Sequence, residues 1–290
     1  RDLTPTHSLV GYDGEEAENQ EASGGGTSFL RFIRDELFPQ IESAYRTLPH
    51  RILVGHSFGG LLALSALLDA PEMFQSYIAI DPSLWWDDQM LVHKMEREFR
   101  AAQERRGSVY LSLANNPDIG NGDPTVPARA FSKSLESAAT PEFRSSLQYF
   151  DSEDHGSVPL LSLYHGLCFA FEGYKPPIEE CVGQPAALTA HFERVSDRLG
   201  MVLRPPRRVV GGLGHYALLH GDVDTAIEFF NLNLSFHPGL FKMYDLLGEA
   251  YMVKGEKALA IENYERSIEI NPHNENARKR LGVLKSKELG

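Results

Sequence analysis

The segment RILVGHSFGGLLALSAL, residues 51–67, places a serine among glycines at the junction of two apolar elements. RILVG has the length and apolar character of a short buried strand, and the residues after the glycines continue as an apolar helix. Glycine costs backbone entropy inside either kind of element. The glycines therefore indicate a tight corner that exposes the serine. A buried strand followed by a buried helix predicts a layered α/β fold.

The same alternation of short apolar segments and amphipathic segments extends from about residue 28 to residue 172. In the amphipathic segments, apolar residues recur every three to four positions, as they do along one face of a helix. Parallel strands joined by helices are buried on both faces, which explains why the strand-like segments are largely apolar. We expect helices at about 27–46, 60–70, 88–105, 126–139 and 158–171, and strands at about 51–55, 76–81, 108–114 and 146–150.

A different pattern begins near residue 205, where the sequence repeats with a period of 34 residues. Small residues, aromatic residues and a closing proline recur at fixed offsets, as in tetratricopeptide repeats, which are helix–turn–helix units. A third copy is cut short at Gly290, and we expect it to act as a cap on the last core. The positions that carry the pattern are Leu213, Gly214, Gly221, Ala226, Phe230 and Pro238, then Leu247, Gly248, Tyr251, Gly255, Ala260, Tyr264 and Pro272, then Leu281 and Gly282.

The two patterns predict a division of the chain into three segments. We expect an α/β domain over residues 1–174, a linker with one helix over 175–206, and helical repeats over 207–290. Paired prolines near both ends of the middle segment favour its interpretation as a linker, because proline interrupts regular structure.

Residues 55–59, GHSFG, match the G-x-S-x-G pattern of the nucleophile elbow in the strand–turn–helix context that this motif requires. Ser57 is then held in a strained conformation with its hydroxyl exposed, and we expect the flanking positions to have no room for side chains. The N–H of Phe58 opens the following helix, where it could donate to an oxyanion with help from the helix dipole. We also expect His56 to line the substrate pocket.

A serine hydroxyl is a weak nucleophile unless a base lies beside it. In proteins with this elbow the acid and then the histidine follow the serine along the chain, and we expect the histidine in the loop after the last strand. His155 occupies this position, just beyond the fourth expected strand and just before the closing helix. The sequence therefore predicts that Ser57 and His155 act together.

Three arrangements stay open for the group that orients His155. The usual place for the acid is the loop after the third strand of this set, where Asp118 is the first carboxylate and Asp123 a second choice. Asp81, at the end of the strand beside the nucleophile's strand, is the alternative. A Ser–His dyad steered by a backbone carbonyl is the third arrangement, and we rank Asp118 first.

Charge and composition argue against several kinds of partner. The net charge of −12 disfavours nucleic acid or an anionic membrane, because both require clustered lysine and arginine. No apolar run approaches the ~20 residues of a membrane-spanning helix. Histidine and carboxylate side chains do not occur at metal-ligand spacing, so we expect neither a metal nor an organic cofactor. We interpret Cys168 and Cys181 as two ordinary thiols.

Four segments carry a resemblance to a known family: RDLTPTHS, GGGTSFLRFIRDELFPQIESAYRT, RILVGHSFGGLLALSAL and YIAIDPSLWWDD. They resemble the esterases of the α/β-hydrolase class that include esterase D and the enterochelin and salmochelin esterases. The resemblance covers about residues 1–172, and some similar proteins carry tetratricopeptide repeats behind the hydrolase domain. It implies an α/β-hydrolase sheet and an esterase with Ser57 as nucleophile and His155 as base. It also places PSLWW near the active site, where Trp85 and Trp86 would line the substrate pocket.

The chain departs from that family near its beginning. In α/β-hydrolases several strands precede the elbow, and a loop among them supplies the second oxyanion donor. Here residues 8–26 have the composition of a polar loop rather than of a sheet. We therefore expect the N-terminal strands to be missing, with an exposed sheet edge and one oxyanion donor fewer. Loss of one such donor costs on the order of 100- to 1000-fold in rate.

The sequence thus predicts hydrolysis of a small-molecule carboxylic ester through an acyl-enzyme on Ser57. Two other functions fit the same residues. In the first, the hydrolase domain is degraded and the repeats bind a protein or peptide partner, or associate with a second copy. In the second, the acyl group passes to a sugar or lipid acceptor instead of water.

Overall fold

The computed structural model describes residues 2–12, 15–16, 22–99, 106–116, 123 and 125–286. The chain divides into two compact units. The first contains Arg1–Glu172 and Asp197–Met201, and the second contains Gly173–Ser196 and Val202–Gly290. Each unit has its own hydrophobic core, and each is described separately below.

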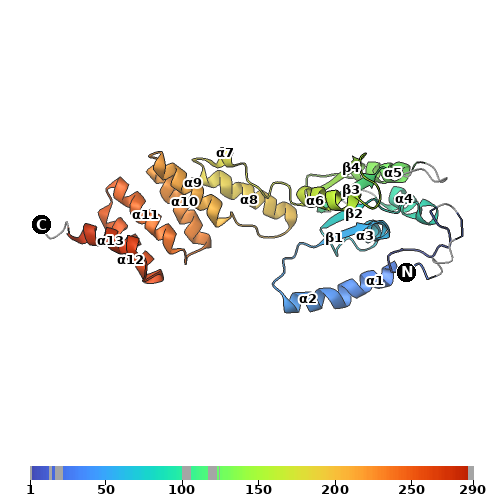
Figure 1. Cartoon of the computed structure of the whole chain (residues 1–290), viewed down its shortest axis with the longest axis horizontal. Helices are drawn as coiled ribbons and strands as arrows, with labels where there is room; N and C mark the ends of the chain where they lie inside the picture. Colours follow the sequence, from blue (N-terminus) through green and yellow to red (C-terminus); the bar gives the residue numbers. More distant parts are fainter. Residues whose placement is uncertain are drawn as a thin grey trace. The chain divides into compact units, whose positions relative to one another are not determined.

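Among the residues that the structure describes, a parallel sheet of four strands forms the centre of the first unit (Figure 1). The strands lie in the order β1 (Ile52–His56), β2 (Ser76–Ile80), β3 (Gly107–Ala114) and β4 (Phe143–Phe150), and each pairs in parallel with the next. Because the strands run the same way, the loops that follow them meet at one edge of the sheet. Within the described residues β1 is an outer strand, and its Val54 is 41% exposed.

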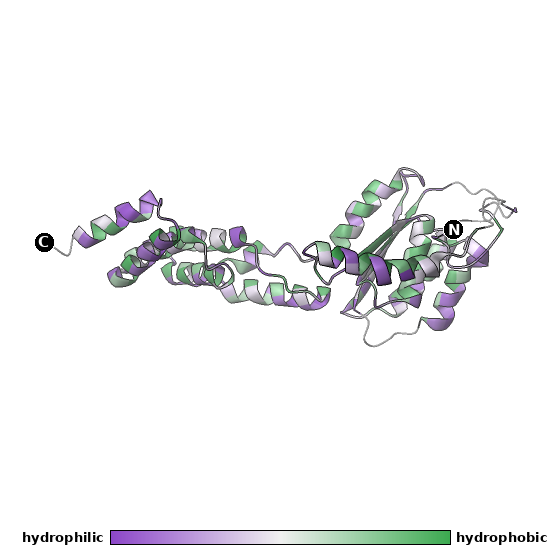
Figure 2. Cartoon of the chain, turned by 90° about the horizontal axis from the view of Figure 1, so that it is seen from below, coloured by the Kyte–Doolittle hydropathy of each residue, from purple (hydrophilic) through white to green (hydrophobic). Residues whose placement is uncertain are grey.

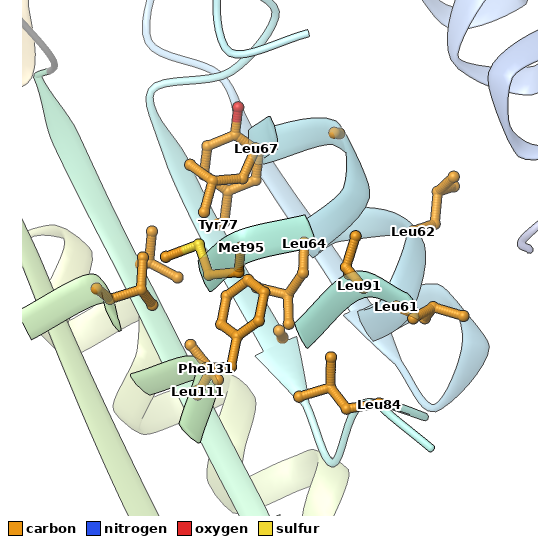
Figure 3. Packing of buried hydrophobic residues seen from close by; sticks show 14 of the residues in the cluster. Leu61, Leu62, Leu64, Leu67, Tyr77, Leu84, Leu91, Met95, Leu111 and Phe131 are labelled. Carbon is orange, nitrogen blue, oxygen red and sulfur yellow. The ribbon is translucent and has the colours of Figure 1, made fainter. Parts of the chain in front are cut away.

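Helices cover both faces of this sheet. One face packs against α3 (Phe58–Asp69), α4 (Trp86–Glu98) and α5 (Thr125–Ser137), and the other against α6 (Val158–Ala170). Side chains alternate between the faces of a strand. Tyr77 therefore belongs to the large apolar cluster drawn in Figure 3, whereas its neighbour Ile78 packs with Val158 on the α6 side. β2 and β3 are buried along their whole length, and Figure 2 shows the sheet mainly in the green of apolar residues.

The segment before β1 forms the helix expected at 27–46, with one irregularity. α1 (Gly26–Phe32), the π-helical turn η2 (Ile33–Leu37) and α2 (Phe38–Ala44) follow one another without a break. Pro39 has no N–H, and in an α-helix its ring would clash with the carbonyl four residues earlier. The wider π turn just before this proline accommodates it.

Two elements differ in length from the sequence-based expectation. The helix expected at 88–105 begins at Trp86 and ends at Glu98, while residues 100–105 lie outside the described part of the chain. β4 begins at Phe143, three residues earlier than expected. The polar residues at its start hid this extension, because an outer strand tolerates half-buried polar side chains.

Five helices of the second unit form the repeats: α9 (Arg207–Leu219), α10 (Val223–Phe236), α11 (Phe241–Lys254), α12 (Lys257–Ile270) and α13 (Glu275–Ser286). Consecutive helices pack against each other. They are preceded by α7 (Ile178–Cys181) and α8 (Pro185–Leu199). Cys181 and Phe192 are buried in one cluster with Leu213 of α9. Much of the segment predicted as a linker is thus packed onto the first repeat.

Glycines at equivalent positions allow the paired helices of each repeat to approach closely. A Cβ atom at Gly214 would lie 2.6 Å from the Phe230 ring, and one at Gly248 would lie 2.8 Å from the Tyr264 ring. Both rings are almost completely buried, so neither can move aside freely. Gly214 and Gly248 of the 34-residue pattern are therefore explained by these two contacts.

Replacing Gly214 with alanine should destabilise the repeats by about 1–3 kcal/mol, because the added methyl group overpacks a tight core. The matched control is Gly212→Ala in the same helix, where a Cβ would meet no atom within 4 Å. That change should stabilise the helix by up to about 1 kcal/mol, since alanine favours helix over glycine. Thermal unfolding of both variants measures the difference. Equal stability of the two would contradict the packing argument.

Within the described residues, no helix combines the length and the apolar character that crossing a membrane requires.

Both cysteines are free thiols, with Cys168 exposed and Cys181 buried.

Candidate active site

Ser57 stands at the corner between β1 and α3 in a strained backbone conformation. Its φ of 58° and ψ of −118° lie outside the regions that a residue with a side chain normally adopts. Backbone hydrogen bonds hold the corner: Ser57 N–H donates to Ile80 O at 3.0 Å, and Ser83 N–H donates to Ser57 O at 3.2 Å. Strain of this kind persists where the surrounding structure fixes it, typically at functional sites.

The glycines around Ser57 are explained unequally by the structure. A Cβ at Gly55 would lie 1.9 Å from Gly59 O, and a Cβ at Gly60 would lie 3.0 Å from Pro82. A Cβ at Gly59 would meet nothing within 4 Å, so the expectation of no room at the flanking positions is wrong there. The carbonyl group of Gly59 lies against Gly55 and leaves no room for a side chain at Gly55. A side chain at Gly59 itself would point into open space.

His155 forms a short contact with Asp81, the carboxylate named as the alternative acid. His155 Nδ1 lies 2.6 Å from Asp81 Oδ2. Asp81 directly follows β2 with a left-handed φ of 41°, and only 6% of its side chain is exposed. Asp118 lies outside the described residues, and Asp123 contacts the N–H of Thr125 instead.

Asp81 is held by donors from the neighbouring strand. Ala114 N–H donates to Oδ1 at 3.1 Å, and Asn116 Nδ2 donates to Oδ2 at 2.7 Å. Burial alone would raise the pKa of Asp81, but the hydrogen bonds from His155, Asn116 and Ala114 outweigh it and the pKa lies below its ordinary value. Asp81 is therefore a fixed carboxylate anion next to the imidazole.

The same contact raises the pKa of His155 above its ordinary value of 6.5. The hydrogen bond to Asp81 is the largest cause, and partial burial acts in the opposite direction. A carboxylate at Nδ1 fixes the orientation of the ring and strengthens it as a base at Nε2. The Asp81–His155 contact thus has the geometry of the acid–histidine pair of a catalytic triad.

Ser57 and His155 both line a cavity of about 370 Å³. Ser57 Oγ lies 3.3 Å from Ser83 Oγ, and the described residues include no hydrogen bond between Ser57 and His155. Such contacts are often loose in the absence of substrate. A change in the Ser57 side-chain rotamer would redirect its hydroxyl. The complete lining is Tyr12, Ser57, Phe58, Asp81, Pro82, Ser83, Leu84, Trp85, Leu113, Asn116 and His155.

The two tryptophans expected at the pocket lie in different surroundings. Trp85 lines the cavity and packs edge-on against Tyr12, with ring centroids 5.3 Å apart. Trp86 is 1% exposed, belongs to the core under α3, and donates its Nε1–H to Thr6 Oγ1 at 3.1 Å. Trp86 is thus a core residue and does not line the cavity, contrary to the expectation. Adjacent residues often lie in different environments. The sequence alone did not show which of the two tryptophans faces the cavity.

His56 also lies beside the site without lining the cavity. Its ring centroid is 4.4 Å from that of His155, and burial lowers the pKa of His56 below its ordinary value. His56 Nε2 is buried and has no hydrogen-bond partner among the described residues. His56 therefore contacts the imidazole of His155 as a neutral ring.

Tyr12 and Asn116 are at the site without a role in the sequence-based prediction, and Ser83 entered that prediction only as part of PSLWW. Asn116 follows β3 and Asp81 follows β2, so parallel strands place both at the same edge of the sheet. That relation is a signal from which the Asn116–Asp81 contact could have been found. No such sequence signal predicts that Tyr12 lies at the site, because this residue precedes the first helix by more than ten residues.

Phe58 is the first residue of α3, so its N–H has no acceptor within the helix and faces outward from the helix N-terminus.

Within the described residues, histidine, cysteine and carboxylate side chains form no group of three or more that could hold a metal ion.

Residues 8–157, more than half of the chain, match the model of a family described as "Putative esterase". The chain belongs to this esterase family. A tetratricopeptide-repeat model matches residues 241–274. The expected family and fold class, an α/β-hydrolase sheet followed by tetratricopeptide-like helices, are thereby confirmed.

Curated proteins named as siderophore esterases are similar to part of this chain. The siderophore triacetylfusarinine C esterase of Aspergillus fumigatus is 38% identical over 97 residues, which are 32% of this chain and 30% of that protein. The ferri-bacillibactin esterase BesA of Bacillus subtilis is 36% identical over 92 residues, which are 31% of this chain and 32% of that protein. The matched part thus spans about a third of the length of these relatives.

Among solved structures, the IroE-like serine hydrolase from Shewanella oneidensis is similar to a larger part of the chain. Its TM-score is 0.66 at 30% sequence identity, and the match covers 81% of this chain and 75% of that one. The similarity supports a serine-hydrolase fold for this member of the esterase family.

Proposed function

We propose that the protein hydrolyses carboxylic esters through an acyl-enzyme on Ser57. The observation that carries this proposal is the 2.6 Å contact between Asp81 and His155 at the cavity that the strained Ser57 also lines. A nucleophile, a base and a carboxylate that orients the base are the three parts of a catalytic triad, which performs acyl transfer. Membership of the esterase family supports the same reaction.

In the proposed mechanism His155 Nε2 takes the proton of the Ser57 hydroxyl as its oxygen attacks the ester carbonyl. The tetrahedral oxyanion accepts a hydrogen bond from the N–H of Phe58. The intermediate then collapses, the C–O bond to the alcohol breaks, and His155 donates its proton to the departing oxygen. A water molecule deprotonated by His155 attacks the acyl-enzyme, which releases the acid and restores Ser57.

Asp81 takes the role of the acid in this proposal. It accepts the Nδ1–H of His155 and stays ionised, which stabilises the imidazolium that forms during each proton transfer. Asn116 and the N–H of Ala114 keep the carboxylate in place. Asp118, which the chain order favoured, is not needed for this arrangement.

The substrate we propose is an ester with an apolar or aromatic part. Tyr12, Phe58 and Trp85 give the cavity an aromatic wall, and its volume of about 370 Å³ suits a ligand of modest size. The curated relatives are named as siderophore esterases. Siderophore-type esters are therefore the first substrates to compare with simple aryl and alkyl esters.

A second role is proposed for the repeats, which the tetratricopeptide match supports. Stacked repeats of this kind present extended surfaces for protein partners. We propose that they bind a protein or peptide partner, independently of hydrolysis at Ser57.

A fluorophosphonate probe tests whether Ser57 is an activated nucleophile. It should phosphonylate Ser57, and mass spectrometry of the digested protein should find the adduct on the peptide that contains this residue. Labelling should weaken as His155 becomes protonated, because a protonated imidazole cannot accept the serine proton. An unlabelled folded protein above the pKa of His155, or an adduct on another serine, would end the proposal.

A further inference from the structure

The backbone beside His155 is held firmly, whereas its ring is held at one atom. The N–H groups of Gly156 and Ser157 both donate to Asp154 Oδ1 at 2.8 Å, which fixes the turn that carries the histidine. Within the described residues the imidazole has one hydrogen bond, from Nδ1 to Asp81. The His155 side chain is 49% exposed. The freedom that remains is therefore rotation of the ring about this single hydrogen bond.

That rotation decides whether His155 can act as a base. Nε2 is the atom that has to face the Ser57 hydroxyl, and it moves when the ring turns about the bond at Nδ1. A misplacement of about 1 Å in a reacting group can cost about 100-fold in rate. A contact on the face of the ring is needed to fix its plane.

His56 supplies such a contact. Its ring centroid lies 4.4 Å from that of His155, and the two ring planes are tilted by 39°. Aromatic rings at this separation attract each other beyond the apolar area that they bury. The His155 imidazole is thus held at its edge by Asp81 and on one face by His56.

The contact also ties the base to the strand that carries the nucleophile. His56 is the last residue of β1 and pairs with Ile80 of β2, and Ser57 follows it directly. The Ser57 N–H donates to Ile80 O at 3.0 Å, so the corner after His56 is fixed by the sheet. A ring packed on His56 is therefore placed relative to Ser57, although His155 lies about 100 positions further along the chain.

His56 is not placed to act on a substrate directly. It does not line the cavity that Ser57 and His155 line, and its Nε2 is buried without a hydrogen-bond partner among the described residues. Whatever His56 contributes to the reaction therefore passes through His155.

The two rings differ in their protonation. Burial, followed by the charge of His155, lowers the pKa of His56 below its ordinary value of 6.5, although a hydrogen bond with the His155 backbone and the charge of Asp81 act in the opposite direction. The pKa of His155 is raised, chiefly by its hydrogen bond to Asp81, with a smaller contribution from the charge of Asp154. As the pH falls, His155 is thus protonated first, and His56 is neutral wherever His155 is neutral.

We propose that His56 is a positioning residue for His155. Its ring packs on the face of the imidazole and, together with Asp81 at Nδ1, sets the direction in which Nε2 points. The proposal rests on the proposed esterase function and adds to it a residue that orients the base without touching the substrate.

The kinetic test compares three replacements of His56 on an aryl ester. His56→Ala should lower kcat by about 10- to 100-fold, because the ring of His155 loses its lateral support. KM should stay within about twofold, since His56 does not line the cavity. His56→Phe should keep kcat within about fivefold of the unmodified chain, because a phenyl ring preserves the packing and removes a buried nitrogen that has no partner. His56→Asn keeps an N–H donor but no ring, so it should resemble His56→Ala.

Val54→Ala is the matched control. Val54 lies two positions earlier on the same face of β1 and is 41% exposed. Its replacement should leave kcat and KM within about twofold. Thermal unfolding of each variant shows whether a loss of activity reflects a loss of folding.

NMR of the histidine rings tests the packing without a substrate. In His56→Ala the Hε1 signal of His155 should move toward the position of an unstacked histidine, whereas His56→Phe should keep it displaced. In the unmodified chain the His155 signal should titrate at a higher pH than the His56 signal.

Three results would overturn the proposal: a rise in KM with unchanged kcat in His56→Ala, recovery of kcat by asparagine but not by phenylalanine, and an unmoved His155 signal in a folded His56→Ala variant. The first would make His56 a pocket residue, and the second would make it a hydrogen-bonding one. If the unmodified chain hydrolyses no ester, the esterase proposal fails, whereas the NMR measurement still decides whether His56 orients the ring.

Discussion

Ser57→Ala should reduce the kcat of ester hydrolysis by about 10⁴- to 10⁶-fold while leaving the protein folded, because no other group can carry the acyl intermediate. The loss should fall on kcat rather than on KM, since the hydroxyl contributes little to substrate binding before attack. Alanine can occupy the corner at least as easily as serine, because the hydrogen bonds that hold it come from the backbone of Ser57. Steady-state kinetics on an aryl ester, with thermal unfolding alongside, measures both effects.

Ser65→Ala provides the matched control for this experiment. Ser65 lies on α3, the helix that follows Ser57; it is 3% exposed and donates to Asp69 Oδ2 at 3.1 Å. Its loss should cost about 1 kcal/mol of stability and leave kcat within about twofold of the unmodified chain. Hydrolysis that survives Ser57→Ala would show that another group carries the reaction.

Asp81→Asn should lower kcat/KM by about 10²- to 10⁴-fold, because an amide cannot hold the imidazole in the required tautomer or stabilise the imidazolium. The variant also changes the pH dependence. Catalysis requires neutral His155, whose pKa Asp81 raises above its ordinary value of 6.5. The unmodified chain should therefore lose activity as the pH falls through that raised pKa. In Asp81→Asn the remaining activity should persist to lower pH, which a pH profile of kcat/KM measures.

Asp154→Asn separates this effect from the simple loss of a nearby charge. Asp154 adjoins His155 in sequence, but hydrogen bonds from the N–H groups of Ser157 and Gly156 occupy its carboxylate and lower its pKa. Replacing it should change kcat/KM by less than about threefold, as expected for an exposed charge screened by water. If Asp118→Asn abolished activity and Asp81→Asn did not, the acid would be Asp118 and the proposed arrangement would be wrong.

The strand–serine–helix corner could be predicted from the sequence because its signals are local. Glycines next to an apolar strand and an apolar helix leave few alternative conformations, and the 34-residue period is equally local. The partner of His155 is different, because Asp81 and His155 are 74 positions apart and meet only through the parallel pairing of the strands. Chain order favoured the loop after β3, whereas the structure joins His155 to the residue that follows β2.

Two other differences have similar physical causes. Trp85 and Trp86 are the same residue type at adjacent positions, yet Trp85 lines the cavity whereas Trp86, the first residue of α4, is buried in the core. The segment predicted as a linker has proline pairs at its ends, but apolar residues of α8 face the first repeat and are buried there. Proline marks where an element stops, and it says nothing about whether the element between two such stops is packed.

The outer position of β1 has a practical consequence for work with the isolated chain. Within the described residues this strand has a neighbour on one side only, and Val54 on it is 41% exposed. The free backbone groups of such a strand can template the addition of a strand from another molecule. Preparations should therefore scatter more light as concentration rises, and storage in dilute solution should keep the material monodisperse for longer than storage as a concentrate.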